Sequence, residues 1–177
     1  VVNLHDNANL VSFPALPGDG NVPLEDIFQD VSENILAVAG ASSAAIYEDG
    51  WSGTLADEGL SDLLGYWVIM SGDDVLSVNG TPMDPETNYS LDIGDNLISY
   101  PHGYNSALLD VLSEEANGSL VAIFGEGISA YNYDGAGYWI GSLQYFTPNS
   151  GYWFLSNDAF DFSYQSGGDL GRTASNY

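Results

Sequence analysis

The side chains best suited to contact a ligand in this chain are aromatic and acidic. Tyr133, Tyr138 and Trp139 lie close together in the sequence, and Glu126 precedes them in the segment Gly125-Glu126-Gly127. Flat aromatic rings suit the C–H faces of sugars, whereas a carboxylate accepts hydrogen bonds from hydroxyl groups. The flanking glycines let the backbone approach a ligand closely. These residues predict a sugar-binding surface in which Tyr133, Tyr138 and Trp139 stack on the ligand and Glu126 is the polar anchor.

A structural explanation competes for the same residues. Trp139 recurs earlier as Trp51, and a recurring tryptophan is expected to hold the core because it buries a large area and fixes a strand register. The glycines around Glu126 also fit a tight turn, and the counterpart Gly40-Ala41-Ser42 carries no carboxylate. We favour core packing for the recurring tryptophans and a turn for the Glu126 segment. Tyrosines outside the repeated segments are expected to be exposed contacts: Tyr104, Tyr133 and Tyr145.

Carboxylates are abundant enough to suggest a hard cation such as calcium, which takes clustered carboxylate and carbonyl oxygens. None of the acidic clusters has the spacing of a recognised calcium loop. The sequence therefore requires no cofactor, and calcium is the cation to test. The candidate ligands fall in three clusters: Asp92 with Asp95, Asp73 with Asp74, and Asn157 with Asp158 and Asp161.

Catalytic motifs are absent from the sequence. The two histidines, His5 and His102, occupy non-equivalent positions, and no nucleophile elbow, zinc-protease helix or phosphate-binding glycine loop is present. We therefore predict that the chain is not an enzyme. A hydrolase is still an alternative, because the carboxylate pair of a glycosidase depends on geometry and leaves no sequence pattern.

The charge balance limits the partners. The chain has 25 acidic residues against one basic residue, Arg172, and a net charge of -24. Such a chain has no lysines to release counterions from phosphates, so nucleic acid is not an expected partner, and anionic membrane surfaces are disfavoured. Salt screens the repulsion between carboxylates, so a saline habitat suits the protein. There are no cysteines, which excludes disulfides.

Three segments occur twice, 86 to 88 residues apart, which indicates one module used twice. The segments are Asn9–Pro14 with Asn96–Pro101, Trp51–Leu55 with Trp139–Leu143, and Gly65–Ile69 with Gly151–Leu155. Each module has several short strand patterns and one short amphipathic helix, which predicts a mainly β fold of two tandem small barrels or sandwiches, mostly antiparallel, with the barrel favoured. The expected boundaries are module one at 1–80, a proline-containing linker at 81–90, module two at 91–165 and a flexible tail at 166–177.

In module two the motifs follow one another in the order Asn96–Pro101, Gly125–Gly127, Trp139–Leu143 and Gly151–Phe154. This order resembles a tandem module of large proteins predicted from marine bacterial and viral environmental sequence. The resemblance covers nearly the whole chain and is closer in module two, because module one departs at Ala41-Ser42 and at Ser52. It implies repeated accessory units in secreted, surface-attached or virion-associated proteins. It implies no mechanism.

Together these observations predict a non-catalytic accessory module of a larger extracellular protein that acts in adhesion or glycan binding. The sequence lacks an initiator methionine, so we expect a fragment whose export signal lies elsewhere. The alternative is a structural component of a surface layer, filament or virion, with protein–protein contacts only. Homo-oligomers are a further expectation under that alternative.

Overall fold

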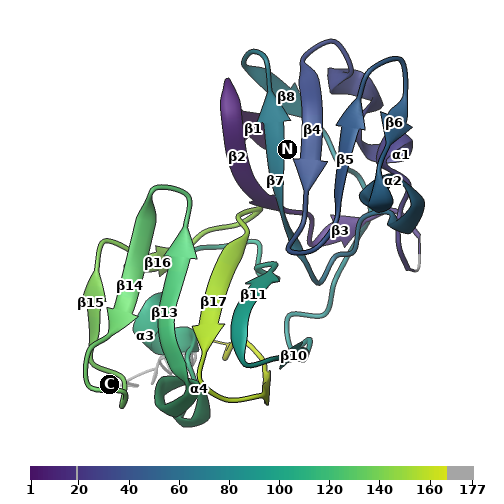
Figure 1. Cartoon of the computed structure of the whole chain (residues 1–177). Helices are drawn as coiled ribbons and strands as arrows, with labels where there is room; N and C mark the ends of the chain where they lie inside the picture. Colours follow the sequence, from purple (N-terminus) through teal and green to yellow (C-terminus); the bar gives the residue numbers. More distant parts are fainter. Residues whose placement is uncertain (19, 167–177) are drawn as a thin grey trace, which may run out of the picture.

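Two five-stranded antiparallel sheets dominate the computed structural model, which describes residues 1–18 and 20–166 (Figure 1). The sheet of module one has the strand order β2-β7-β4-β5-β6, and the sheet of module two has the equivalent order β11-β17-β13-β14-β15. The mainly β, antiparallel fold and its duplication are thus confirmed. No closed barrel forms among the described residues, so the sandwich-like form is the one observed.

The strands of the two large sheets follow the same order in both halves of the chain, but an element between them differs: helix α2 follows β6 in module one, whereas strand β16 follows β15 in module two. The elements of module one are β1 (Val2–Leu4), β2 (Asn7–Ser12), β3 (Ala15–Leu16), α1 (Leu24–Phe28), a 3₁₀ turn (Gln29–Val31), β4 (Ile35–Ala39), β5 (Ala44–Tyr47), β6 (Trp51–Ser52), α2 (Thr54–Glu58), β7 (Gly65–Met70), β8 (Asp74–Leu76) and β9 (Thr81–Pro82). Those of module two are β10 (Tyr89–Leu91), β11 (Gly94–Ile98), β12 (Ser106–Ala107), α3 (Leu108–Val111), α4 (Glu114–Ser119), β13 (Leu120–Gly125), β14 (Ile128–Asn132), β15 (Trp139–Gly141), β16 (Tyr145–Phe146), β17 (Tyr152–Ser156) and β18 (Phe160–Phe162).

Some elements differ from the sequence-based expectations. Each module has two short α-helices where one was predicted, and in module two Ser113 starts the second of them by accepting a hydrogen bond from the Ala116 N–H. The predicted linker at 81–90 contains β9 and the first two residues of β10, which pairs with β18. The predicted tail at 166–177 lies outside the described residues, except for Ser166. Among the described residues, no helix has the length and apolar character needed to cross a membrane.

Each sheet buries one face against its own helices and short ribbons. Alternate strand residues point to opposite faces, and the inward set includes Tyr66 and Val68 in module one and Tyr152 and Phe154 in module two. The core of module two is rich in aromatic rings, and Phe146 lies 4.8 Å from Tyr152 between ring centroids. In Figure 1 both sheets turn their other face toward the viewer, and α3 lies behind the second sheet.

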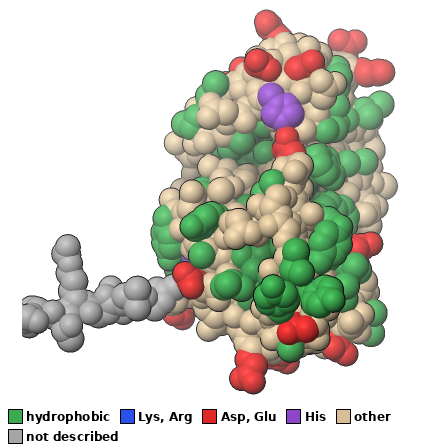
Figure 2. All heavy atoms as spheres, turned by 90° about the vertical axis from the view of Figure 1, so that its left-hand side faces the viewer, with side chains coloured by type: hydrophobic (Ala, Val, Ile, Leu, Met, Phe, Trp, Pro, Cys, Tyr) green, Lys and Arg blue, Asp and Glu red, His purple; other side chains and the backbone are tan. Residues whose placement is uncertain are grey.

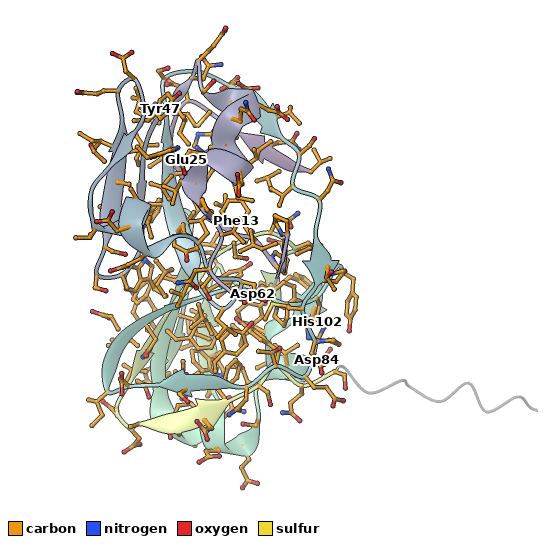
Figure 3. The ribbon with its side chains drawn as sticks, turned by 90° about the vertical axis from the view of Figure 1, so that its right-hand side faces the viewer. Phe13, Glu25, Tyr47, Asp62, Asp84 and His102 are labelled. Carbon is orange, nitrogen blue, oxygen red and sulfur yellow. The ribbon has the colours of Figure 1, made fainter. Side chains whose placement is uncertain are left out.

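The modules meet through equivalent contacts, as the two halves of a two-fold dimer do. The Ser12 N–H donates to the Asn149 carbonyl at 2.8 Å, and the matching Ser99 N–H donates to the Leu63 carbonyl at 3.0 Å. The glycines that open the repeated Gly-Tyr-Trp segments face each other at this junction. A Cβ added to Gly65 would lie 3.1 Å from the Cα of Gly151, and the reverse distance is also 3.1 Å. Figure 3 places Asp62 at the same junction.

Candidate functional site

The repeated Trp-x-Gly segment positions the candidate tryptophans. Gly53 and Gly141 have positive φ angles of 126° and 152°, and a Cβ on either would lie 2.4 Å or 2.1 Å from a carbonyl oxygen of the neighbouring strand. The following hydroxyl completes the same contact in both modules, because the oxygens of Thr54 and Ser142 accept the N–H groups of Ala44 and Ser129. The motif therefore binds β6 and β15 tightly to the strand beside them.

Trp139 is partly buried and has a structural partner. Its indole N–H donates to the Asn117 side-chain oxygen at 2.7 Å, and its ring packs against the core of module two. The equivalent Trp51 is also partly buried, and its ring centroid lies 5.6 Å from Phe28 and 5.1 Å from Tyr47. Both tryptophans therefore cover an edge of their core, in line with the structural explanation, while part of each ring remains open to solvent.

The connection between β14 and β15 forms an ordered hairpin that displays two tyrosines; we call residues 133–138 the aromatic hairpin. The Tyr133 N–H donates to the Tyr138 carbonyl at 2.8 Å, which closes its base. Inside the loop, Asp134 Oδ1 accepts the N–H groups of Tyr138 and Ala136 at 3.0 and 2.9 Å. These two hydrogen bonds hold the pKa of the Asp134 carboxyl below its usual value, and the one from the Tyr138 N–H has the larger effect. The loop is thus fixed by its own backbone before any ligand arrives.

The two tyrosines of the aromatic hairpin are open to solvent and lie together. Tyr133 is 76% exposed and Tyr138 is 61% exposed, and their ring centroids lie 6.2 Å apart in an edge-on arrangement. Three more exposed apolar side chains belong to the neighbouring strands of the same module: Tyr131, Ile140 and Tyr145. Figure 2 shows hydrophobic side chains gathered over this part of module two. Tyr104, Tyr133 and Tyr145 are exposed, as the sequence predicted.

A hollow of about 210 Å³ lies beside Trp139. Its lining includes the exposed Tyr145, the carboxylate-bearing Asp110 and the amide-bearing Gln144. Module one has a comparable hollow against Trp51, lined by Glu25, Asp26, Gln29 and Tyr47 among others. Figure 3 shows Glu25 and Tyr47 in the upper part of this module. In such a hollow the aromatic ring can stack on a sugar ring, and the carboxylate and the amide can hydrogen-bond to the sugar hydroxyls.

Glu126 lies in the turn between β13 and β14 and contacts module one. Its Oε2 accepts the Leu10 N–H at 2.7 Å, and its Oε1 lies 2.6 Å from His5 Nε2. The other ring nitrogen of His5 lies 2.6 Å from the carbonyl of Asp6. Both neighbours of the ring are acceptors, so both contacts are hydrogen bonds when the two ring nitrogens carry protons. The hydrogen bond to the Asp6 carbonyl, and after it that to Glu126, raises the pKa of His5. Figure 2 shows the histidine next to a carboxylate on this face.

The predicted sugar-binding residues are thus only partly assembled. Tyr133 and Tyr138 come together, and Trp139 follows them but points to the core side of its strand. Glu126 lies at the far end of β14, roughly 16 Å of extended strand away. Both of its oxygens have partners within the chain. The contact with His5 carried no sequence signal, because the two residues are distant in the chain and belong to different modules.

The metal candidates do not gather around one point. Within the residues that the structure describes, no three acidic or histidine side chains are grouped as cation ligands. Asp161 accepts a hydrogen bond from the Ser90 hydroxyl, and the backbone carbonyl of Asp158 accepts one from the Ser156 hydroxyl. The predicted ligands Asp92, Asp95, Asn157, Asp158 and Asp161 therefore remain predictions.

His102 is buried among aromatic rings in module two, and Figure 3 labels it. Its ring centroid lies 5.3 Å from Tyr100 and 6.3 Å from Tyr164. Its Nε2 and the Tyr164 hydroxyl have no hydrogen-bond partner among the described residues. Burial lowers the pKa of His102. The two histidines thus belong to different modules and different surroundings.

Comparison with known proteins adds no further information on these surfaces: no protein-family model matches the chain, and searches of curated proteins and of solved structures found no significant match.

Proposed function

We propose that this chain is a non-catalytic glycan-binding module of a larger extracellular protein and that the aromatic hairpin is its contact surface. The observation that carries the proposal is the exposed pair of Tyr133 and Tyr138, held 6.2 Å apart on a loop fixed by Asp134. A preorganised loop loses little conformational entropy when it binds. Two rings at this spacing offer a stacking surface for a sugar and an edge against which it can be oriented.

The charge of the protein narrows the ligand class. With a net charge of -24, the protein repels sulfated and carboxylated glycans, so the proposed ligand is a neutral oligosaccharide. The hollow beside Trp139 supplies the polar groups for a neighbouring sugar unit, since Asp110 accepts hydrogen bonds and Gln144 accepts and donates them. Glu126 is left out of this site, because Leu10 and His5 engage its carboxylate.

The test is a screen of neutral oligosaccharides on a glycan array, followed by calorimetry with the best ligand. Tyr133→Ala and Tyr138→Ala should each weaken binding by about tenfold, since an aromatic contact contributes about 0.5–1.5 kcal/mol beyond its buried area. Tyr104→Ala, another exposed tyrosine of module two, is the matched control and should leave the affinity unchanged. A blank array, or equal losses in all three variants, would contradict the proposal.

A structural role is the second candidate. The observation that favours it is the apolar face of each large sheet that points away from the core clusters.

A further inference from the structure

The sheet faces that point away from the two cores are apolar in both modules. In module one, one row across the sheet runs through Ile69, Ala37 and Ile46. The equivalent row in module two runs through Leu155, Ala122, Tyr131 and Ile140. Ile46 is 49% exposed and Tyr131 is 51% exposed. A neighbouring row contains Trp67 in the first sheet, and in the second it contains Trp153 and Phe124 as a cross-strand pair.

Carboxylates are almost excluded from this outer face. Among the residues that the structure describes, Asp95 is the only acidic residue at an outward position on the paired strands of the two sheets, and it lies opposite Leu155. The remaining outward positions of those strands are apolar, serine or glycine. Large apolar surfaces that lack charge mark interaction sites on soluble proteins. Figure 2 shows this face edge-on at its right-hand side, where hydrophobic side chains extend over both modules.

The outer face also has the size and symmetry of a dimer interface. Five strands about 4.8 Å apart, with a mean length of about five residues, give each sheet a face of roughly 400 Å², so the two sheets present roughly 800 Å². That is about the area each partner contributes to a stable interface. The two modules carry equivalent rows around a pseudo-two-fold junction, so a partner that matches one half should match the other. A second copy of the chain carries the same duplicated apolar rows, so it can match both halves of the face.

We propose that two copies of this module pair associate through the outer faces of their sheets, independently of glycan binding. Sheets pack face to face about 10 Å apart with interdigitated side chains, and here the contact brings apolar rows together while most carboxylates remain at the rim. The net charge of -24 on each copy opposes the encounter, and salt screens that repulsion over a Debye length of about 8 Å at physiological ionic strength. Dimerisation therefore strengthens as salt is added.

The test is analytical ultracentrifugation of the whole chain, without glycan, at about 0.05 M and about 0.5 M NaCl and at protein concentrations up to about 100 μM. The expected species at high salt has twice the monomer mass of 18.9 kDa, and its dissociation constant rises at least tenfold at low salt. Ile46→Asp and Tyr131→Asp, one in each sheet, should each abolish the dimer. Val75→Asp, an exposed apolar position on β8 outside the two large sheets, should not.

Circular dichroism of each variant checks that it is folded, and the Ile46→Ala variant supplies a milder change at the same position. A wild-type monomer at both salt concentrations would overturn the proposal. A dimer that survives both aspartate substitutions would also overturn it, because the contact would then lie elsewhere. If such a monomer still bound glycan, the proposed glycan-binding function would be unaffected. Dimerisation and glycan binding are therefore tested independently.

Discussion

The two modules share the residues that build the fold and differ in one hairpin loop, in one contact across the junction and in how one tryptophan is held. Asn9 and Asn96 each hold the loop before their strand, because each side-chain oxygen accepts the N–H of a residue four positions earlier and each amide donates to that residue's carbonyl. Tyr66 and Tyr152 are both buried, and their hydroxyl oxygens accept the N–H groups of Ser61 and Thr147 at 2.7 and 2.8 Å. What recurs in the sequence is therefore structural.

Three differences between the modules bear on the proposed function. The β14–β15 connection is 133–138, whereas its counterpart is the shorter 48–50. Glu126 bridges the modules, whereas the matching position is Ala41. Trp139 is held by a hydrogen bond and Trp51 by aromatic rings. A loop lengthened in one copy of a repeat is a common place for binding residues.

The largest effect is expected at the glycine shared by both Trp-x-Gly segments. Gly141→Ala should lower the unfolding free energy by about 2–4 kcal/mol, because the new Cβ meets a strand carbonyl and the positive φ is strained for alanine. Gly53→Ala should cost a similar amount. Gly118→Ala lies in a helix, meets nothing within 4 Å and should not destabilise. Urea denaturation measures all three, and a large difference between Gly53→Ala and Gly141→Ala would break the equivalence.

Removing the shared tyrosine hydroxyl should have a smaller effect. Tyr66→Phe and Tyr152→Phe each leave one backbone N–H without its acceptor, at a cost of about 1–2 kcal/mol. The same denaturation curves apply, and the two values should agree within about 0.5 kcal/mol. An effect confined to one module would show that the hydroxyls do not play the same part in both. Burial raises the pKa of Tyr66 to about 12, so the hydroxyl stays protonated in these measurements.

The pKa values of the two histidines should be shifted in opposite directions, upward for His5 and downward for His102. The raised pKa of His5 means that its contribution to stability is complete below its unfolded pKa of about 6.5 and is lost as pH rises through the folded value. The lowered pKa of His102 gives stability that is present above about pH 6.5 and declines as pH falls toward the folded value. NMR titration of the two imidazoles measures both values. Glu126→Gln should lower the pKa of His5 and leave that of His102 unchanged.

The smallest effect is expected from copying the bridge into module one. Ala41 is equivalent to Glu126, but Asp92 stands where the matching histidine would be. Ala41→Glu alone should lower the thermal midpoint slightly through carboxylate repulsion, and adding Asp92→His should restore or raise it below about pH 6.5. Differential scanning calorimetry at pH 5.5 and pH 8 compares the variants. A double variant no more stable than the single one would show that the junction is not symmetric enough to accept a second bridge.

The duplication, the strand-rich fold and the presence of a short helix in each module follow from recurring motifs and apolar spacing in the sequence. The junction did not follow, because it depends on how two copies turn toward each other, and the role of Gly65 and Gly151 appears only when both strands are placed. The exposure of Tyr133 was predictable, because module one has no equivalent tyrosine. The separation of Glu126 from the tyrosines was not, because the sequence gives no distance between the two ends of a strand.

The most direct test removes the main difference between the modules. In this variant, the aromatic hairpin 133–138 is replaced by the shorter Glu-Asp-Gly connection of module one, and neutral oligosaccharide binding is measured by calorimetry beside the wild type. We predict a folded variant with an unchanged core, seen by near-UV circular dichroism, that has lost glycan binding. A folded variant that binds as tightly as the wild type would contradict the claim that the differing hairpin, and not the shared framework, contacts the ligand.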